Sequence, residues 1–233
     1  MTPICSVLII TRLRPVLLQE TIDSFLGKAM FPERVEILVR VHDNDDETLQ
    51  WASTRDKKIR VVIGDTEDGY GSLHKFINCL AAVSNGDWLW CGSDDVKMIT
   101  QNWDSILQSE LPAPKETCRI VTAQVVNMPN TRTTIISRAF YNALGHCGLT
   151  PHCDCYIDAL AHFAGIRVPI GIQIQDMHTD SVPYVVPRDV EKTWAEYRSQ
   201  KSAHCFNMDK LKLGAILKKD LGNWTTSHAP ENP

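Results

Sequence analysis

The stretch 85–95 reads NGDWLWCGSDD and joins an apolar, aromatic-rich run to a pair of adjacent acids. The run from Asp87 to Cys91 is short and follows a glycine, which predicts a buried β-strand. The predicted strand is followed almost at once by Asp94 and Asp95. Because ligands of open parallel sheets bind beyond the carboxyl ends of the strands, we expect a binding site at these two acids.

The residues before this stretch alternate between strand-like and helix-like patterns. Short β-rich runs are found at three places, residues 4–10, 35–41 and 59–63. Helical periodicity begins at Pro15 and recurs over 73–84, and the acidic block at 43–47 can cap a short helix. This alternation is typical of βαβ units and predicts an α/β fold with a mixed, mostly parallel central sheet flanked by helices.

The second half of the chain is less regular. It contains β-rich runs at 119–127 and 166–174 and helical patterns at 137–144 and 154–164. Gly165 ends the second helical pattern. After Pro187 the pattern becomes helical and charged. Since no internal repeat or low-complexity linker interrupts the chain, we expect one domain over 1–187 with a C-terminal helical extension over 188–233 packed on it.

Composition limits the classes of protein that the chain can belong to. It has 233 residues, of which 43% are hydrophobic, enough for a sizeable core. The formal net charge is -4, so a basic surface for nucleic acid is not indicated. The apolar run at 4–10 is closed by Thr11 and Arg12, and is too short for a membrane span and unlike a signal peptide. We therefore expect a cytoplasmic protein.

Three of the eight cysteines lie close together in the sequence. Cys147, Cys153 and Cys155 have His146 and His152 beside them, and such a cluster can hold zinc. Their spacing matches no common zinc pattern, because paired C-x2-C knuckles are absent. The cluster is either a zinc site or a loop of reduced cysteines, and we expect the reduced loop.

The acids at the strand ends are the first candidates for chemistry. Asp94 and Asp95 can hold Mg²⁺ or Mn²⁺ and leave coordination positions for a diphosphate. Alternatively, they only cap a following helix, where the helix dipole favours acids. Asp43 can accept a hydrogen bond from a nucleotide base, or belong to a solvated helix start. Arg12 can pair with phosphate, or be an exposed arginine.

Two later residues are candidates on the other side of the same edge. Asp154 begins a predicted helix on which Asp158 and His162 share its face. It can act as a general base toward an acceptor hydroxyl, or simply cap a polar helix face. His178 follows the last predicted strand and is either a metal ligand or a structural histidine. The joint arrangement of these candidates favours the functional interpretation.

Two spacings in the chain resemble those of the GT-A glycosyltransferases, specifically family two. In that family an Asn is followed by a Gly eight residues later, then by an aromatic-containing strand and an Asp-rich motif, as at Asn78 and Gly86 here. A later acid is followed by a Gly after eleven residues and by a His after thirteen more, as at Asp154, Gly165 and His178. The resemblance covers about residues 4–178.

The resemblance implies roles for individual residues. Asp43 contacts the nucleotide base, Asp94 the ribose or sugar, and Asp95 the divalent metal. Asp154 is the catalytic base, and His178 assists metal or diphosphate binding. The other residues implied in the nucleotide pocket are Thr11, Arg12, Lys75 and Asn78.

The chain also departs from the family pattern. Ile77 stands where family members often have Arg, and Lys75 is a possible substitute one helical turn before Asn78. Gly92 replaces the usual first acid of the Asp-rich motif, and Cys153 replaces the Glu that often precedes the catalytic Asp. The Q-x-x-R-W signature of processive synthases is absent, which favours an enzyme that makes a single transfer.

The sequence therefore predicts a glycosyltransferase dependent on Mn²⁺ or Mg²⁺ that moves a sugar from a nucleoside diphosphate sugar to an acceptor hydroxyl with inversion. A nucleotidyltransferase-like enzyme with the same pocket and a non-catalytic GT-A-like binding module are the alternatives. A bacterial surface glycan is the expected acceptor. A modified base of phage DNA is less favoured. A local group of lysines leaves room for it, although on a helix such lysines more often form a solvated face: Lys210, Lys212, Lys218 and Lys219.

Overall fold

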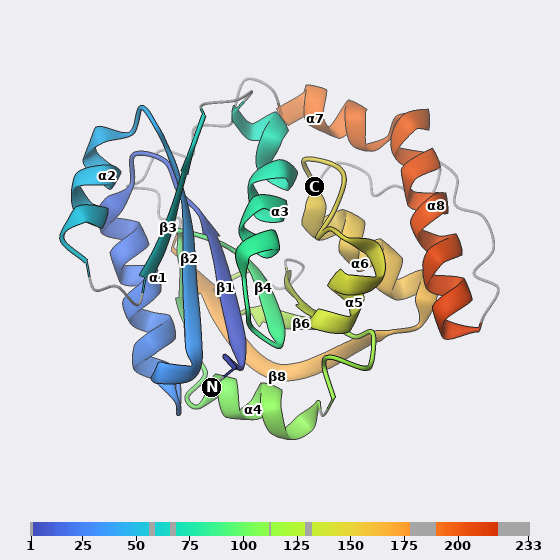
Figure 1. Cartoon of the computed structure of the whole chain (residues 1–233), viewed down its shortest axis with the longest axis horizontal. Coiled ribbons are helices and arrows are strands. Elements are labelled where there is room, and N and C mark those ends of the chain that lie inside the picture. Colours follow the sequence, from blue (N-terminus) through green and yellow to red (C-terminus); the bar gives the residue numbers. More distant parts are fainter. Residues whose placement is uncertain are drawn as a thin grey trace.

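The computed structural model describes residues 2–55, 59–65, 69–111, 113–128, 132–177 and 190–218. Within these ranges the chain forms an eight-stranded sheet with the strand order β3-β2-β1-β4-β7-β6-β8-β5 (Figure 1). The strands are β1 (Cys5–Ile10), β2 (Val35–His42), β3 (Ile59–Gly64), β4 (Trp88–Ser93), β5 (Val96–Met98), β6 (Ile120–Val125), β7 (Arg132–Ser137) and β8 (Arg167–Asp176).

Helices connect the strands and cover the sheet. In chain order they are α1 (Pro15–Lys28), α2 (Asp46–Ser53), α3 (Leu73–Val83), α4 (Trp103–Glu110), α5 (Arg138–Leu144), α6 (Cys153–Ala164), α7 (Val190–Tyr197) and α8 (Gln200–Leu217). Two short 3-10 turns, η1 (Pro32–Arg34) and η2 (Gly69–Ser72), precede β2 and α3. Gly165 ends α6 in the left-handed conformation, as its place after the helical pattern predicts.

The pairing of the strands confirms a mixed, mostly parallel sheet. β1 lies parallel between β2 and β4, β2 pairs in parallel with β3, and β6 pairs in parallel with β8. The pairs β4 with β7, β6 with β7 and β5 with β8 are antiparallel. The strands β5 and β7 and the helix α4 were not expected from the sequence.

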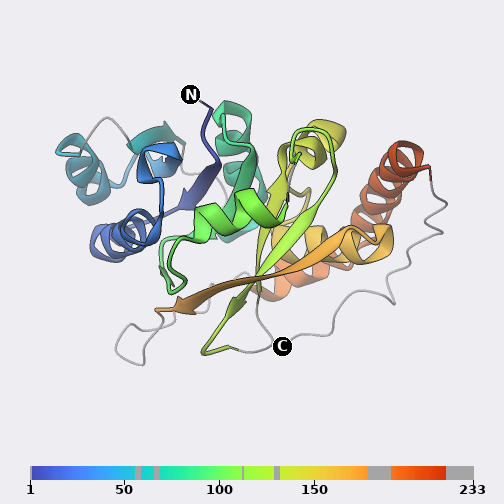
Figure 2. The ribbon, with the colours of Figure 1, turned by 90° about the horizontal axis from the view of Figure 1, so that it is seen from below.

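The two faces of the sheet carry separate hydrophobic cores. Alternate residues of β1 point to opposite faces, so that Val7 packs with Phe25 of α1 while Leu8 packs with Leu80 of α3. The same alternation in β4 places Trp90 beside α1 and α4 and Leu89 beside α3. The molecule is therefore a three-layer α/β/α structure, with α1 and α2 at the opposite end from α8 (Figures 1 and 2).

Gly86 allows the turn before β4 to lie directly against β1. A Cβ atom at this position would lie 2.4 Å from the backbone nitrogen of Ser6, and the Gly86 amide donates to the Ser6 hydroxyl at 2.7 Å. This contact sets the parallel register in which Ser93 lies opposite Ile10. The residues that follow β1 and β4 consequently meet at one edge of the sheet.

The C-terminal helices complete the core on the α3 side. Trp194 and Tyr197 of α7 and Phe206 and Leu213 of α8 are buried in the same core as Leu160 of α6. Among the described residues, no helix combines the length and the apolar character that crossing a bilayer requires.

Candidate functional site

Thr11 and Asp94 meet at the carboxyl ends of β1 and β4. The Thr11 hydroxyl donates a hydrogen bond of 2.6 Å to Oδ2 of Asp94, and both side chains are buried. Asp94 and Asp95 lie in a turn between β4 and β5, not at the start of a helix. The alternative that they cap a helix is therefore wrong. The short strand β5 follows instead, because it pairs with the end of β8.

Asp95 is held from both sides. Its Oδ1 accepts a hydrogen bond of 2.5 Å from the Ser93 hydroxyl, and its backbone carbonyl accepts one of 2.7 Å from the amide of Met177. The end of β8 thus lies against the acid pair. His178, which follows Met177 in the sequence, lies outside the described residues.

Arg14 joins the two acids, and the sequence did not single it out. One guanidinium nitrogen lies 2.5 Å from Oδ1 of Asp94 and another lies 3.0 Å from Oδ2 of Asp95. Arg14 directly precedes Pro15 at the start of α1, and its side chain therefore leaves the backbone at the same edge as Thr11. The only sequence signal for it was a second arginine after the first strand.

The acid pair is electrostatically unusual. Asp94 is fully buried, and burial raises its pKa to about 6, with a further contribution from Asp95 that Arg14 and Thr11 oppose. The two carboxylates contact one guanidinium, so the cluster carries a net negative charge when both acids are ionised.

The end of β2 carries an acid that lies in solvent and another that is buried. Asp43 is exposed, and its backbone amide donates to the carbonyl of Gly64 at 3.0 Å. Asp45 is buried and caps α2, and it also accepts a hydrogen bond of 2.7 Å from the amide of Leu13. Burial alone would raise the Asp45 pKa, but the amides of Leu13 and Thr48 outweigh burial and lower it. Asp45 therefore fixes the loop after β1.

Arg12 is exposed in that loop, beside the end of β2. Burial lowers the pKa of His42, the last residue of β2, and the positive charges of Arg40 and Arg12 lower it further. Arg40 is turned inward, and its guanidinium donates to the carbonyl of Gly64 at 2.8 Å. Arg12 is therefore an exposed cation at this edge, while Arg40 supports the backbone below it.

Asn78 connects α3 to the loop that precedes α6. Its amide nitrogen donates to the carbonyl of Gly148 at 2.8 Å, and its amide oxygen accepts from the backbone of Cys147 at 2.7 Å. Gly148 has φ +146, and a Cβ there would lie 2.7 Å from the Cβ of Cys153. Lys75, one turn earlier on α3, is exposed.

The same loop is also held by the two C-terminal helices. The carboxylate of Asp209 in α8 accepts a hydrogen bond of 2.5 Å from the hydroxyl of Tyr156. Nε2 of His146 lies 3.0 Å from the same carboxylate. Burial would raise the pKa of Asp209, but the hydrogen bonds from His146 and Tyr156 outweigh burial and lower it. Nε2 of His152 lies 3.0 Å from the Thr193 hydroxyl of α7.

Asp154 is exposed in the first turn of α6, at the end of this loop. Asp158, one turn later, pairs with Arg167 at 3.1 Å, and His162 is exposed. The shared face predicted for these three residues thus carries one ion pair and two exposed side chains. Asp154 lies at the end of α6 that adjoins the supported loop.

Comparison with known proteins yields mainly solved structures. A fragment of S. aureus TarS solved with UDP-GlcNAc has a TM-score of 0.59 at 14% identity over 91% of this chain and 70% of the TarS chain. The mannosyltransferase PcManGT from Pyrobaculum calidifontis, solved with GDP-Man and Mn²⁺, has a TM-score of 0.56 at 14% identity over 94% of this chain and 69% of its own. The chain has a GT-A-like fold.

Relatives by sequence are distant. No protein-family model matches the chain. An uncharacterised protein of Sinorhizobium fredii, y4gI, is 28% identical over 120 residues, which are 50% of this chain and 13% of that protein. The GT-A-like chain also spans only 58% of the TarS fragment in its complex with UDP. These likenesses therefore establish the fold and not a particular activity.

The acid pair of this GT-A-like sheet fits a divalent cation. Carboxylate oxygens are the ligands that Mg²⁺ and Mn²⁺ prefer, and such ions are often held by one or two carboxylates together with substrate phosphates. The pair offers two carboxylates against the single guanidinium of Arg14. Within the described ranges, no three His, Cys, Asp or Glu side chains form a metal-binding group.

The cysteines beside α6 are free thiols. Cys147 is buried, and its contact with Cys91 of β4, followed by burial, raises the pKa of Cys91. Burial and the nearby Asp154 raise the pKa of Cys153 and of Cys155.

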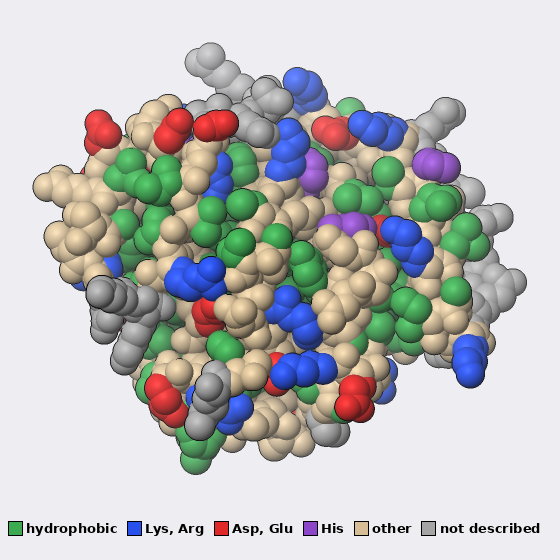
Figure 3. Space-filling model, viewed as in Figure 1, with side chains coloured by type: hydrophobic (Ala, Val, Ile, Leu, Met, Phe, Trp, Pro, Cys, Tyr) green, Lys and Arg blue, Asp and Glu red, His purple; other side chains and the backbone are tan. Residues whose placement is uncertain are grey.

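One lysine of the predicted patch is turned away from solvent. Lys210 is only 2% exposed, and its Nζ lies 4.2 Å from the centre of the Phe163 ring, because the helix turns this residue into the core. Lys212 lies 3.5 Å from the Asp209 carboxylate, and Lys219 is outside the described residues. On the face in Figure 3, the coloured basic side chains are scattered rather than gathered in one area.

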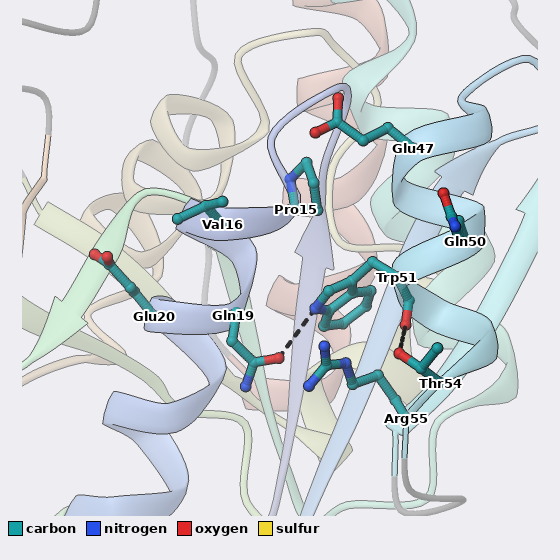
Figure 4. A pocket seen from close by; sticks show the side chains of 9 residues that line it. All are labelled: Pro15, Val16, Gln19, Glu20, Glu47, Gln50, Trp51, Thr54 and Arg55. Atoms are coloured by element: carbon teal, nitrogen blue, oxygen red, sulfur yellow. Dashed lines mark hydrogen bonds between the residues drawn. The ribbon is translucent and has the colours of Figure 1, made fainter.

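An open pocket of about 470 Å³ lies between α1 and α2 (Figure 4). Trp51 forms one wall, and its indole nitrogen donates to the side-chain oxygen of Gln19 at 3.0 Å. None of the residues predicted for the functional site lines this pocket.

Proposed function

We propose that this protein is a glycosyltransferase that moves a sugar from a nucleoside diphosphate sugar to an acceptor hydroxyl. The observation that carries this proposal is the meeting of Thr11, Asp94 and Asp95 at the carboxyl ends of β1 and β4 in a GT-A-like sheet. Solved proteins of similar fold, TarS and PcManGT, bind UDP-GlcNAc and GDP-Man, which supports a nucleotide sugar as the ligand.

The donor is proposed to lie across the ends of β1, β2 and β4. Asp43, exposed after β2, would accept a hydrogen bond from the base, and Asp94 would fix the ribose or sugar. Arg12 and Lys75 are exposed cations for the phosphates. Thr11 orients Asp94 through its hydroxyl. Asn78 acts indirectly, because both ends of its amide hold the loop before α6.

Asp95 and His178 are proposed to hold a divalent cation, Mn²⁺ or Mg²⁺. Such a cation would supply positive charge to the departing diphosphate. Support comes from the hydrogen bond between the Met177 amide and the Asp95 carbonyl, which brings the end of β8 to the acid pair. Ser93 orients the Asp95 carboxylate through its hydroxyl.

Asp154 is proposed as the general base. The acceptor hydroxyl would give its proton to the Asp154 carboxylate while its oxygen bonds to the anomeric carbon. The bond from that carbon to the diphosphate breaks on the opposite face, so the configuration inverts and the diphosphate leaves. The exposed position of Asp154 in the first turn of α6 supports this role, since an acceptor can reach it.

A panel of nucleotide sugars and nucleoside diphosphates, with and without Mn²⁺, tests the proposal by thermal shift. A ligand at about a hundred times its Kd stabilises the folded state by about 2.7 kcal/mol, which is about 5–10 °C for a chain of this size. Mass spectrometry of the products with glycan acceptors then identifies sugar transfer. Pyrophosphate release from a triphosphate would indicate a nucleotidyltransferase, and no shift with any nucleotide would indicate a binding module.

A further inference from the structure

Arg14 contacts both members of the acid pair, including Asp95, to which the proposed function assigns the cation. Its guanidinium spans the two side chains, at 2.5 Å from Oδ1 of Asp94 and 3.0 Å from Oδ2 of Asp95. A planar guanidinium has donors on separate nitrogens and can bridge two carboxylates in this way, whereas an ammonium group is a single point charge. Arg14 is therefore a positive partner of both acids.

The contact of Arg14 with Asp95 can open more easily than its contact with Asp94. The Asp94 side chain is fully buried and is also bound by Thr11, so it stays in place. The Arg14 side chain is 36% exposed, and the Asp95 side chain is 9% exposed. Release of Arg14 from Asp95 moves a side chain that already reaches solvent, and it leaves Asp95 oriented by the Ser93 hydroxyl.

A divalent cation and the guanidinium compete for the same carboxylate. The contact between Arg14 and Asp95 uses Oδ2, while Oδ1 accepts the neutral Ser93 hydroxyl. A cation bound to Asp95 would lie within a few ångströms of the guanidinium, and two positive charges at such a distance repel strongly where water is partly excluded.

We propose that Arg14 is a positioning residue that occupies Asp95 in the free protein and is displaced from it when a divalent cation binds. This inference rests on the proposed function, because it uses Asp95 as the cation ligand. The displaced guanidinium stays at the N-terminus of α1, beside Thr11, as a planar donor suited to phosphate oxygens. Arg14 thereby makes cation binding weaker when no nucleotide sugar is present whose phosphates could bind the released guanidinium.

The experiment is a titration of nucleotide-free protein with Mn²⁺, followed by the electron paramagnetic resonance signal of the unbound ion. Arg14→Gln removes the competing charge and keeps a polar side chain. We expect it to bind Mn²⁺ about tenfold more tightly than the wild type, which corresponds to about 1.4 kcal/mol. Arg14→Lys keeps the charge but cannot bridge both acids, and we expect an intermediate affinity.

Arg55→Gln is the matched control, because it removes the same charge from an exposed arginine that contacts Trp51 beyond the end of α2. We expect this control to bind Mn²⁺ as the wild type does. Equal or weaker Mn²⁺ binding by Arg14→Gln, with a melting curve like that of the wild type, would overturn the inference while leaving Asp95 as a ligand. Failure of every variant and of the wild type to bind Mn²⁺ would overturn the inference together with the cation site.

Discussion

Replacing Asn78 with alanine removes both hydrogen bonds that join α3 to the loop before α6. The side chain donates to the Gly148 carbonyl at 2.8 Å and accepts from the Cys147 amide at 2.7 Å. Cys147 is fully buried, so water cannot readily replace the lost partner. We therefore expect Asn78→Ala to destabilise the fold and to loosen the approach to Asp154.

The size of the effect follows from the two contacts. Each hydrogen bond contributes about 1 kcal/mol net, and a buried group left without its partner costs about 1–3 kcal/mol. The expected loss in the free energy of unfolding is about 2–4 kcal/mol, which lowers the melting temperature by about 5–15 °C.

Asn127 provides a matched control in the same chain. Like Asn78, its side-chain amide makes two hydrogen bonds with the backbone: it donates to the Asp176 carbonyl at 2.8 Å and accepts from the Asp176 amide at 2.9 Å. Unlike Asn78, Asn127 is exposed. Asn127→Ala should therefore cost less than about 1 kcal/mol, since water can replace the side chain. Urea denaturation of both variants measures the difference. Equal losses, or no loss in Asn78→Ala, would refute the reasoning.

Three further predictions concern acids. Asp154→Asn should lower turnover by about 10²–10⁴-fold with donor binding largely kept, as measured by steady-state kinetics. Asp209→Asn should lower the free energy of unfolding by about 2–4 kcal/mol at pH 7. That loss should shrink below about pH 4. The pKa of Asp209 is lowered in the folded state, so its carboxylate stabilises the fold only while it is ionised. Asp94→Asn should stabilise the metal-free protein by about 3 kcal/mol at pH 7.5 and by little at pH 4.

The sign of the last prediction follows from the direction of the shift. The pKa of Asp94 is about 6 in the folded protein and near 3.8 when unfolded. The folded state therefore binds a proton more readily, and ionised Asp94 costs stability as the pH rises from about 4 through 6. Wild-type turnover in Asp154→Asn, a pH-independent loss in Asp209→Asn, or a destabilised Asp94→Asn at pH 7.5 would each contradict the assignment concerned.

The first half of the fold was predictable because its signals are local. Apolar runs bounded by glycine or acids indicated β1 to β4, and the stripes after Pro15 and Leu73 indicated α1 and α3. β7 was missed although its sequence RTTIIS is rich in threonine and isoleucine, which favour strands. β5 escaped because it has three residues and forms only by pairing with β8. A strand such as β5 depends on a partner far away in the chain.

The site was predictable to the same extent. The ends of β1 and β4 meet because parallel strands end at one edge, so Thr11 and Asp94 could be placed there from the sequence. Arg14 could not be, because two arginines follow β1 and nothing in the local sequence tells which of them turns toward the acids. Asn78 was singled out by its spacing as a residue of the nucleotide pocket, whereas its contacts with the loop before α6 depend on tertiary packing.

The most direct test of the account is calorimetric titration of UDP and GDP into wild type and Asp95→Asn, each with and without Mn²⁺. Asp23→Asn, an exposed acid of α1, serves as the control for the change in charge. We predict that Mn²⁺ strengthens binding of at least one of the two nucleotides to the wild type and to the control, and that Asp95→Asn loses this dependence. Nucleotide binding that responds to Mn²⁺ equally in Asp95→Asn, or no binding of either nucleotide to the wild type, would contradict the account.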